Sequence, residues 1–212
     1  PIKQILMVKN ISIDNMPLDG GTLCLDFVNT VHHRKKTPLE DYFHEFGDLL
    51  YWAKKVGIVD HGSYRIMAIE SAKRKTTARL FFVKAIELRE LVFRIFLNIA
   101  SRQPIDTGDL EAFNNYAAAY FASIRLIRKG SRVVENLALD AGDFNSITVP
   151  VLKSAYELLI SDKLERVKEC PNCGWLFLDS TKNGKRRWCS MKSCGSGVKA
   201  LEYYYRKKEG IY

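Results

Sequence analysis

Four closely spaced cysteines constrain this sequence more than any other feature. Cys170, Cys173, Cys189 and Cys194 follow the pattern C-x2-C, then fifteen residues, then C-x4-C. Two cysteines separated by two residues form a tight knuckle that presents both sulfurs to one metal, and a tetrahedral zinc ion takes four thiolates. Four free thiols or two disulfides are the alternatives, and the spacing favours zinc. Since four ligands leave no open position, we expect one structural zinc ion.

The net charge changes sharply along the chain. Lys and Arg number 33 and Asp and Glu 24, for a formal charge of +9. Residues 1–162 hold 21 basic and 19 acidic groups, whereas residues 163–212 hold 12 and 5. This asymmetry predicts two domains, 1–162 and 163–212. A tail of about 45 residues buries too little apolar surface to fold alone, so we expect zinc to stabilise it on an independently folded base.

Composition and the N-terminus narrow the class of protein. The chain is 47% hydrophobic and 27% charged, as is usual for globular proteins. There is no run of about 18 apolar residues, so no membrane span is expected. Polar residues interrupt positions 1–16, which do not resemble a signal peptide, so we expect a cytoplasmic location, where stable disulfides are rare.

Hydrophobic periodicity predicts an α+β fold whose N-terminal domain is mostly helical with a small β-sheet. Ser63 is the expected cap of one helix and Asp106 or Thr107 of another, and the longest helix includes Leu80 and Val83 on its apolar face. Helices are expected over residues 22–31, 40–56, 64–74, 77–101, 110–120 and 150–161, a short strand over 9–15, and a hairpin of strands over 122–128 and 132–139.

The order of elements expected in the tail is a knuckle, a hairpin and a closing helix, as in a treble-clef or ribbon-like finger. The Asn183-Gly184 pair lies between two strand-like runs within residues 175–188 and predicts the hairpin turn. On the closing helix, one face carries Val198, Leu201 and Tyr205 and is expected to pack down. The opposite face carries Lys199, Tyr203 and Arg206 and is expected to face water.

Basic residues of the hairpin and helix form a candidate phosphate-binding surface. With four thiolates and one zinc ion bound, the tail keeps a formal charge of about +5. Charge alone is also compatible with an ordinary solvated face. The candidate nucleic-acid-binding residues are Lys182, Lys185, Arg186, Arg187, Lys192, Lys199, Arg206 and Lys207.

A second candidate site lies near the N-terminus. Asp26, Asn29 and Thr30 are polar groups in an otherwise apolar stretch, and Arg34 follows shortly after. Buried polar groups need hydrogen-bond partners, so these residues either tie down neighbouring backbone, the commoner outcome, or line a ligand pocket. An enzyme using Asp26, Asn29 or His32 is a third possibility, but no nucleophile–base pair is recognisable by spacing, so we predict that the protein is not an enzyme.

Two segments resemble a known pair of domains. Residues 173–195, C-G-W-L-F-L-D-S-T-K-N-G-K-R-R-W-C-S-M-K-S-C-G, resemble the CGNR-type zinc finger. Residues 23–31, L-C-L-D-F-V-N-T-V, resemble the opening of the ABATE domain, which precedes this finger in bacterial proteins. The resemblance implies a bacterial transcription regulator with an α/β regulatory or ligand-sensing domain and a DNA-binding finger. It also implies that the four cysteines are the zinc ligands and that residues 185–187 are the finger's basic run.

The sequence departs from the finger's name-giving motif. The expected C-G-N-R is here Cys194-Gly195-Ser196-Gly197, so any contact made by the Arg is lost, while Ser196 could cap the closing helix. The leading hypothesis is a DNA-binding transcriptional regulator whose N-terminal domain senses an effector or dimerises. The alternative is a zinc-scaffolded protein-interaction module without direct DNA binding, suggested by the missing Asn-Arg pair and the aromatic run 203–205. DNA, a small-molecule effector and a second copy of the chain are the expected partners.

Overall fold

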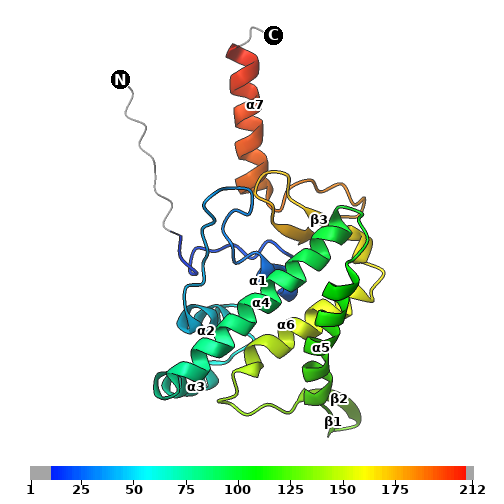
Figure 1. Cartoon of the computed structure of the whole chain (residues 1–212). Helices are drawn as coiled ribbons and strands as arrows, with labels where there is room; N and C mark the ends of the chain where they lie inside the picture. Colours follow the sequence, from blue (N-terminus) through cyan, green and yellow to red (C-terminus); the bar gives the residue numbers. More distant parts are fainter. Residues whose placement is uncertain (1–10, 209–212) are drawn as a thin grey trace.

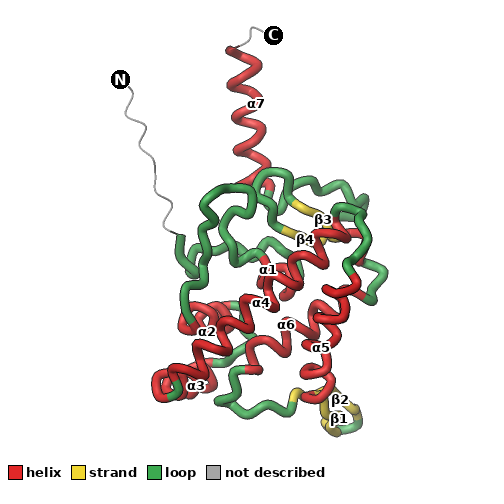
Figure 2. Tube along the Cα trace, in the orientation of Figure 1, coloured by secondary structure: helices red, strands yellow, loops and turns green. Residues whose placement is uncertain are grey.

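The computed structural model describes residues 11–208, apart from the side chains at positions 198, 199, 201, 202 and 208 (Figures 1 and 2). The chain is mostly helical, with one antiparallel hairpin before α6 and a second one after it. The elements are α1 (Leu23–Val28), α2 (Phe46–Lys55), α3 (His61–Lys73), α4 (Lys75–Ala100), α5 (Thr107–Ser123), β1 (Ile124–Lys129), β2 (Arg132–Leu137), α6 (Asn145–Leu159), η1 (Leu164–Arg166), β3 (Val167–Glu169), β4 (Leu176–Leu178), η2 (Met191–Gly195) and α7 (Ser196–Lys208).

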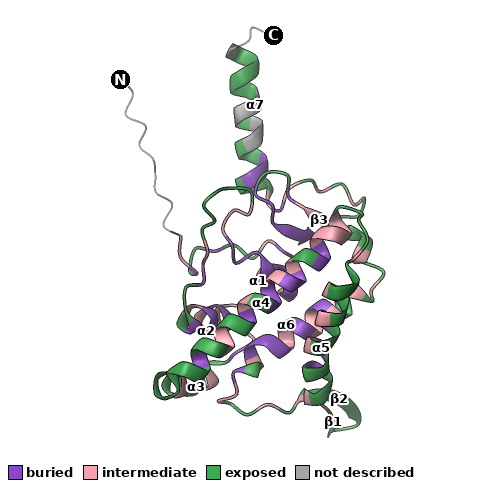
Figure 3. Cartoon of the chain, viewed as in Figure 1, coloured by how far each residue is buried: buried purple, intermediate pink, exposed green. Residues whose placement is uncertain are grey.

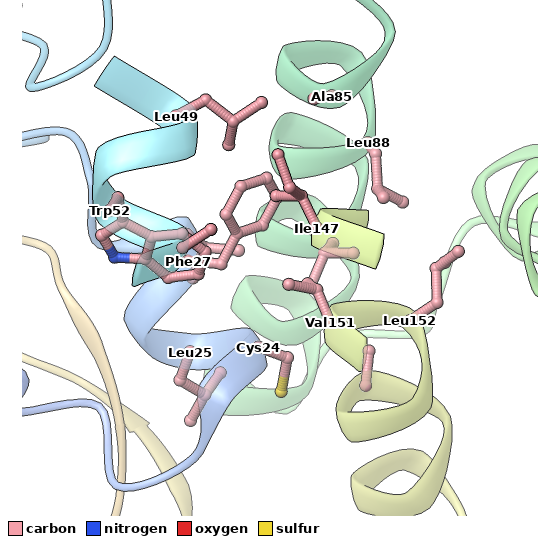
Figure 4. Packing of buried hydrophobic residues seen from close by; sticks show 14 of the residues in the cluster. Cys24, Leu25, Phe27, Leu49, Trp52, Ala85, Leu88, Ile147, Val151 and Leu152 are labelled. Carbon is pink, nitrogen blue, oxygen red and sulfur yellow. The ribbon is translucent and has the colours of Figure 1, made fainter. Parts of the chain in front are cut away.

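Helix α4 is the scaffold of the molecule. It runs diagonally across the body (Figure 1) and contacts α1, α2, α3 and α5, while α6 packs on α1 and α5. Figure 4 shows the centre of the core, which includes Leu88 and Ile147; the tilted rings of Phe27 and Trp52 lie there with their centroids 5.3 Å apart. Cys24 is fully buried in the same cluster. The predicted fold class, a mostly helical domain with small antiparallel sheets, is confirmed.

Helix starts follow from local capping. The Asp60 side chain accepts hydrogen bonds from Gly62 N and Ser63 N, so Asp60 caps α3 and the predicted cap Ser63 is wrong. Asp106 caps α5 by accepting from Asp109 N, one of the two residues expected for that role. A carboxylate at the cap satisfies N–H groups that have no partner within the helix.

Two expectations about residues outside the core are corrected. The strand expected over residues 9–15 is not present in its described part, 11–15, where the chain forms a turn; residues 9 and 10 lie outside the described residues. Leu80 and Val83 of α4 are 60% and 46% exposed rather than buried. The apolar stripe of α4 extends past the part of the helix that neighbouring helices cover.

The predicted hairpin in the helical domain is confirmed. Strands β1 and β2 pair antiparallel in a register that places Lys129 opposite Arg132, with Gly130 at φ 64° in the turn. Glycine adopts this left-handed conformation without a Cβ clash. The hairpin lies at the end of the molecule opposite α7 (Figure 1), and most of its side chains are exposed (Figure 3).

The C-terminal part, residues 163–208, is called the finger below. The expected boundary after residue 162 falls in the turn between α6 and η1. The finger is not a separate head, because its buried Trp175, Leu176 and Phe177 belong to the same hydrophobic cluster as the helical domain. Strands β3 and β4 both contact α4. The helical domain and the finger therefore share one hydrophobic core. No helix in the described part of the chain is long and apolar enough to cross a membrane.

Candidate metal centre

The four cysteines of the finger converge on one point. Their sulfur atoms all lie within 4.8 Å of one another, and all four residues are buried. The Sγ atoms of Cys173 and Cys189 are 3.6 Å apart, as are those of Cys189 and Cys194. A tetrahedral ion with Zn–S bonds of about 2.3 Å sets its sulfurs about 3.8 Å apart. The donor set, its spacing and its burial therefore fit one zinc ion.

The first two ligands are held by a tight turn between β3 and β4. Gly174 N donates to Cys170 O at 2.9 Å, and Cys170 N donates to Trp175 O at 2.8 Å. Gly174 has φ 76°, and a Cβ there would lie 3.1 Å from the Cβ of Arg34. Glycine is therefore required both by backbone conformation and by the close approach of the helical domain.

The predicted position of the finger's hairpin is wrong. The paired strands are β3 and β4, with Val167 opposite Leu178, so the turn between them is the cysteine knuckle rather than Asn183-Gly184. Gly184 does sit in a turn, where its N–H donates to Thr181 O at 3.1 Å, but the chain from residue 179 to 190 is irregular.

A buried carboxylate fixes this irregular loop. Asp179 is fully buried and accepts from Lys168 Nζ at 2.6 Å, Arg186 N at 2.8 Å and Thr181 Oγ1 at 2.6 Å. Burial alone would raise the pKa of Asp179, but these donors, led by Lys168, hold its pKa far below the usual value. Lys168 Nζ also donates to the carbonyls of Gly184 and Arg186. The ion pair therefore sets the path of the chain towards Cys189.

Sequence reasoning missed Asp179 and Lys168. The available signal was an aspartate directly after the apolar run W-L-F-L. A charged side chain beside a buried run must either reach solvent or be paired with an opposite charge.

Arg186 hydrogen-bonds to the backbone around the zinc ligand Cys189. Its guanidinium donates to the carbonyl oxygens of Trp188 at 3.0 Å and Asp19 at 3.3 Å and to that of Cys189, and it lies 4.6 Å from the centre of the Phe177 ring. These contacts point the side chain into the protein. The loop of residues 179–190, which leads to the zinc ligand Cys189, is called the ligand loop below. Of the expected nucleic-acid-binding residues, Arg186 thus links the ligand loop to the helical domain.

Asn29 joins the helical domain to the finger. Its fully buried amide donates from Nδ2 to Leu176 O at 2.8 Å and accepts at Oδ1 from Leu176 N at 2.9 Å. Asn29 thereby satisfies both backbone groups of Leu176, the first residue of β4. Two further bonds reinforce the joint, from Trp175 Nε1 to Val31 O at 2.7 Å and from Arg34 N to Cys173 O at 2.9 Å.

The other residues of the expected ligand pocket are also engaged within the protein. Thr30 Oγ1 donates to Phe27 O at 2.8 Å, and the Arg34 guanidinium donates to Glu90 at 2.8 Å and to a backbone carbonyl. Asp26 accepts from Gly20 N at 2.8 Å, and burial raises its pKa to about 6. None of Asp26, Asn29, Thr30 and Arg34 lines the pocket beside the metal centre described below. In the structure these four residues hydrogen-bond to other groups of the protein, most of them backbone groups.

The exposed residues of the expected basic set lie in the loop of residues 179–190, in η2 and on α7. Tyr205 is 49% exposed, so the expectation that it packs down is wrong; the side chains of residues 198, 199 and 201 lie outside the described ones. Ser196 Oγ donates to Met191 O at 2.8 Å and stands at the first position of α7, so it does not act as the expected cap. The exposed basic set is Lys182, Lys185, Arg187, Lys192, Arg206 and Lys207.

The geometry defines a helical domain with a four-cysteine zinc finger packed into its core. Comparison with family models identifies the two parts. Residues 21–162 match the ABATE family, whose description reads "Putative stress-induced transcription regulator", and residues 166–207 match the CGNR zinc finger. The chain belongs to the ABATE family and carries a CGNR zinc finger, as the sequence resemblance implied. A search of curated proteins found no match.

Proposed function

We propose that this chain is a DNA-binding transcription regulator that contacts the duplex through α7 and the basic loops at its base. The observation that carries the proposal is the placement of α7, which follows directly on the segment with Cys194 and projects from the body (Figure 1). Its 13 residues give a length of about 20 Å. The major groove of B-DNA is wide enough for an α-helix.

The charges around α7 support a phosphate-binding role. Arg206 and Lys207 lie on the helix, Lys192 lies in η2 directly before it, and Lys185 and Arg187 lie in the ligand loop, all with exposed side chains. Lysine and arginine bind phosphates and release counterions, which makes affinity fall with salt. Ser196 and Gly197 stand where the CGNR motif has Asn and Arg, so the proposed phosphate contacts come from the other basic residues.

The test compares two triple variants with the same loss of charge. One is Lys185→Ala/Arg187→Ala/Lys192→Ala, at the base of α7. The matched control is Arg128→Ala/Lys129→Ala/Arg132→Ala, in the exposed hairpin at the opposite end of the molecule. Fluorescence anisotropy with a labelled random duplex is measured over a range of salt concentrations. The first variant is expected to reduce the slope of log K against log salt by about 2–3, and the control by close to zero. Equal slopes for both variants, or no binding at low salt, would refute the proposal.

A protein-interaction role is the second candidate. Three consecutive tyrosines on α7, at positions 203–205, are 53%, 59% and 49% exposed. Aromatic side chains are enriched at protein interfaces. If the duplex assay fails at low salt, a nuclease-resistant, stoichiometric protein partner that is lost on Tyr203→Ser/Tyr204→Ser substitution would support this role.

A further inference from the structure

A pocket of about 200 Å³ lies between the helical domain and the metal centre. In the same measure a single water needs only about 10–15 Å³, so the pocket has room for a small organic molecule. It is lined by Ile11, Asn15, Pro17, His32, His33, Tyr42, Asn172, Cys173, Trp175, Cys189, Ser193 and Cys194. The sequence analysis singled out only the metal-binding cysteines and, as a possible catalytic group, His32 from this lining.

The walls of this pocket are pre-formed. Trp175 is 4% exposed and is fixed by its Nε1 bond to Val31 O, and Tyr42 is 6% exposed with its hydroxyl 2.9 Å from His32 Nδ1. A β-bridge between Val31 and Asp41 holds the two walls together. Rigid walls reduce the entropy cost of binding a ligand.

The charge around the pocket selects the kind of ligand. Among the described residues, no Lys, Arg, Asp or Glu lines it. Three of its lining residues, Cys173, Cys189 and Cys194, belong to the metal centre, where four thiolates with Zn²⁺ bound would sum to a formal charge of −2. Trp175 and Tyr42 are the aromatic residues of the described lining, and the face of an aromatic ring attracts cations. Of the described residues that line the pocket, only His32 and His33 can carry a positive charge.

We propose that this pocket is a binding site for a small planar cation, such as an aromatic amidine or amine. The ring of the ligand would lie against Trp175 and Tyr42, and its N–H groups would face the thiolates and the polar rim formed by His33 and Asn172. Ser193 and Cys194 of the pocket belong to η2, the segment that leads directly into α7. A bound molecule would therefore contact the base of that helix.

The experiment uses the full-length, zinc-loaded protein and three probes of nearly the same shape: benzamidine (cationic), benzamide (neutral) and benzoate (anionic). Calorimetry gives the affinities and NMR gives the position. Benzamidine is expected to bind about tenfold more tightly than benzamide, with benzoate weakest. Of the three indole N–H signals, that of Trp175 is expected to shift while that of Trp52, in the helical core, stays in place.

Two variants locate the site. His33→Ala and Asn172→Ala are each expected to weaken benzamidine binding about fivefold, the loss of about one hydrogen bond. Asn183→Ala, an exposed asparagine of the same finger that does not line the pocket, is the matched control and should leave the affinity unchanged. Binding of benzoate as tight as benzamidine, no binding of any probe, or equal effects of pocket and control variants would overturn the proposal. The probe series needs no variant, so it remains decisive if a variant fails to fold.

Discussion

Replacement of Asn29 by Ala should destabilise the helical domain and the finger together. The substitution removes two hydrogen bonds, of 2.8 and 2.9 Å, and leaves the N–H and C=O of Leu176 buried without a partner. Each unsatisfied buried backbone group costs about 1–3 kcal/mol. The expected loss is therefore about 2–6 kcal/mol, a large fraction of the roughly 5–15 kcal/mol that stabilises a typical domain.

Urea unfolding followed by circular dichroism and by zinc release measures this loss. Both signals should move to lower urea by the same amount, because Asn29 joins the two parts through their shared core. Asn172→Ala, an exposed asparagine of the finger, is the control and should change stability by less than about 0.5 kcal/mol. The reasoning fails if Asn29→Ala behaves like this control, or if zinc is lost early while the helical signal keeps its midpoint.

Further predictions follow from single contacts. Removing zinc with a chelator should lower the thermal midpoint of the whole helical signal, not of a C-terminal fraction, as differential scanning calorimetry can show. Arg186→Ala should destabilise the protein, whereas Arg187→Ala should change only duplex affinity; unfolding and anisotropy measurements separate the two effects. Gly174→Ala, at φ 76°, should cost about 1–2 kcal/mol in unfolding free energy. Burial raises the pKa of Asp26 to about 6, above its unfolded value, so stability should fall as the pH rises from about 4 to 6; Asp26→Asn should remove this trend and add about 1–2 kcal/mol at pH 7.

The metal centre was predictable because its chemistry is local. The ligands come in two pairs, and the members of each pair lie within a few residues of each other. Zinc binds four thiolates, so it is expected to bring the two pairs together. The helices were predictable for a similar reason, since periodicity and capping act over one or two turns. The ends of the helices were less predictable. For example, the cap of α3 is Asp60 and not the expected Ser63.

The errors arise where distant residues compete with local signals. The Asn183-Gly184 turn is a sound hairpin signal by itself, but the buried Asp179–Lys168 pair draws the loop inward, and β4 pairs with β3 instead. The partner of Asn29 lies 147 residues away, at Leu176, so its type and burial were foreseeable but its role as a joint was not. Arg186 is a similar case: its charge suggested a ligand-facing residue, whereas its contacts are with carbonyls of the protein.

The shared core changes how this finger can be regulated. In a finger that folds alone, the helix that faces DNA responds only to the metal. Here the ligand loop is held by Arg186 against Asp19, the knuckle by Arg34 N, and the core strand by Asn29, so a shift in the helical domain must move the cysteines or break these bonds. Packed cores respond to such shifts by switching between discrete arrangements rather than by deforming smoothly. Since η2 contains Cys194 and leads directly into α7, any such switch would act first on the element proposed to contact DNA.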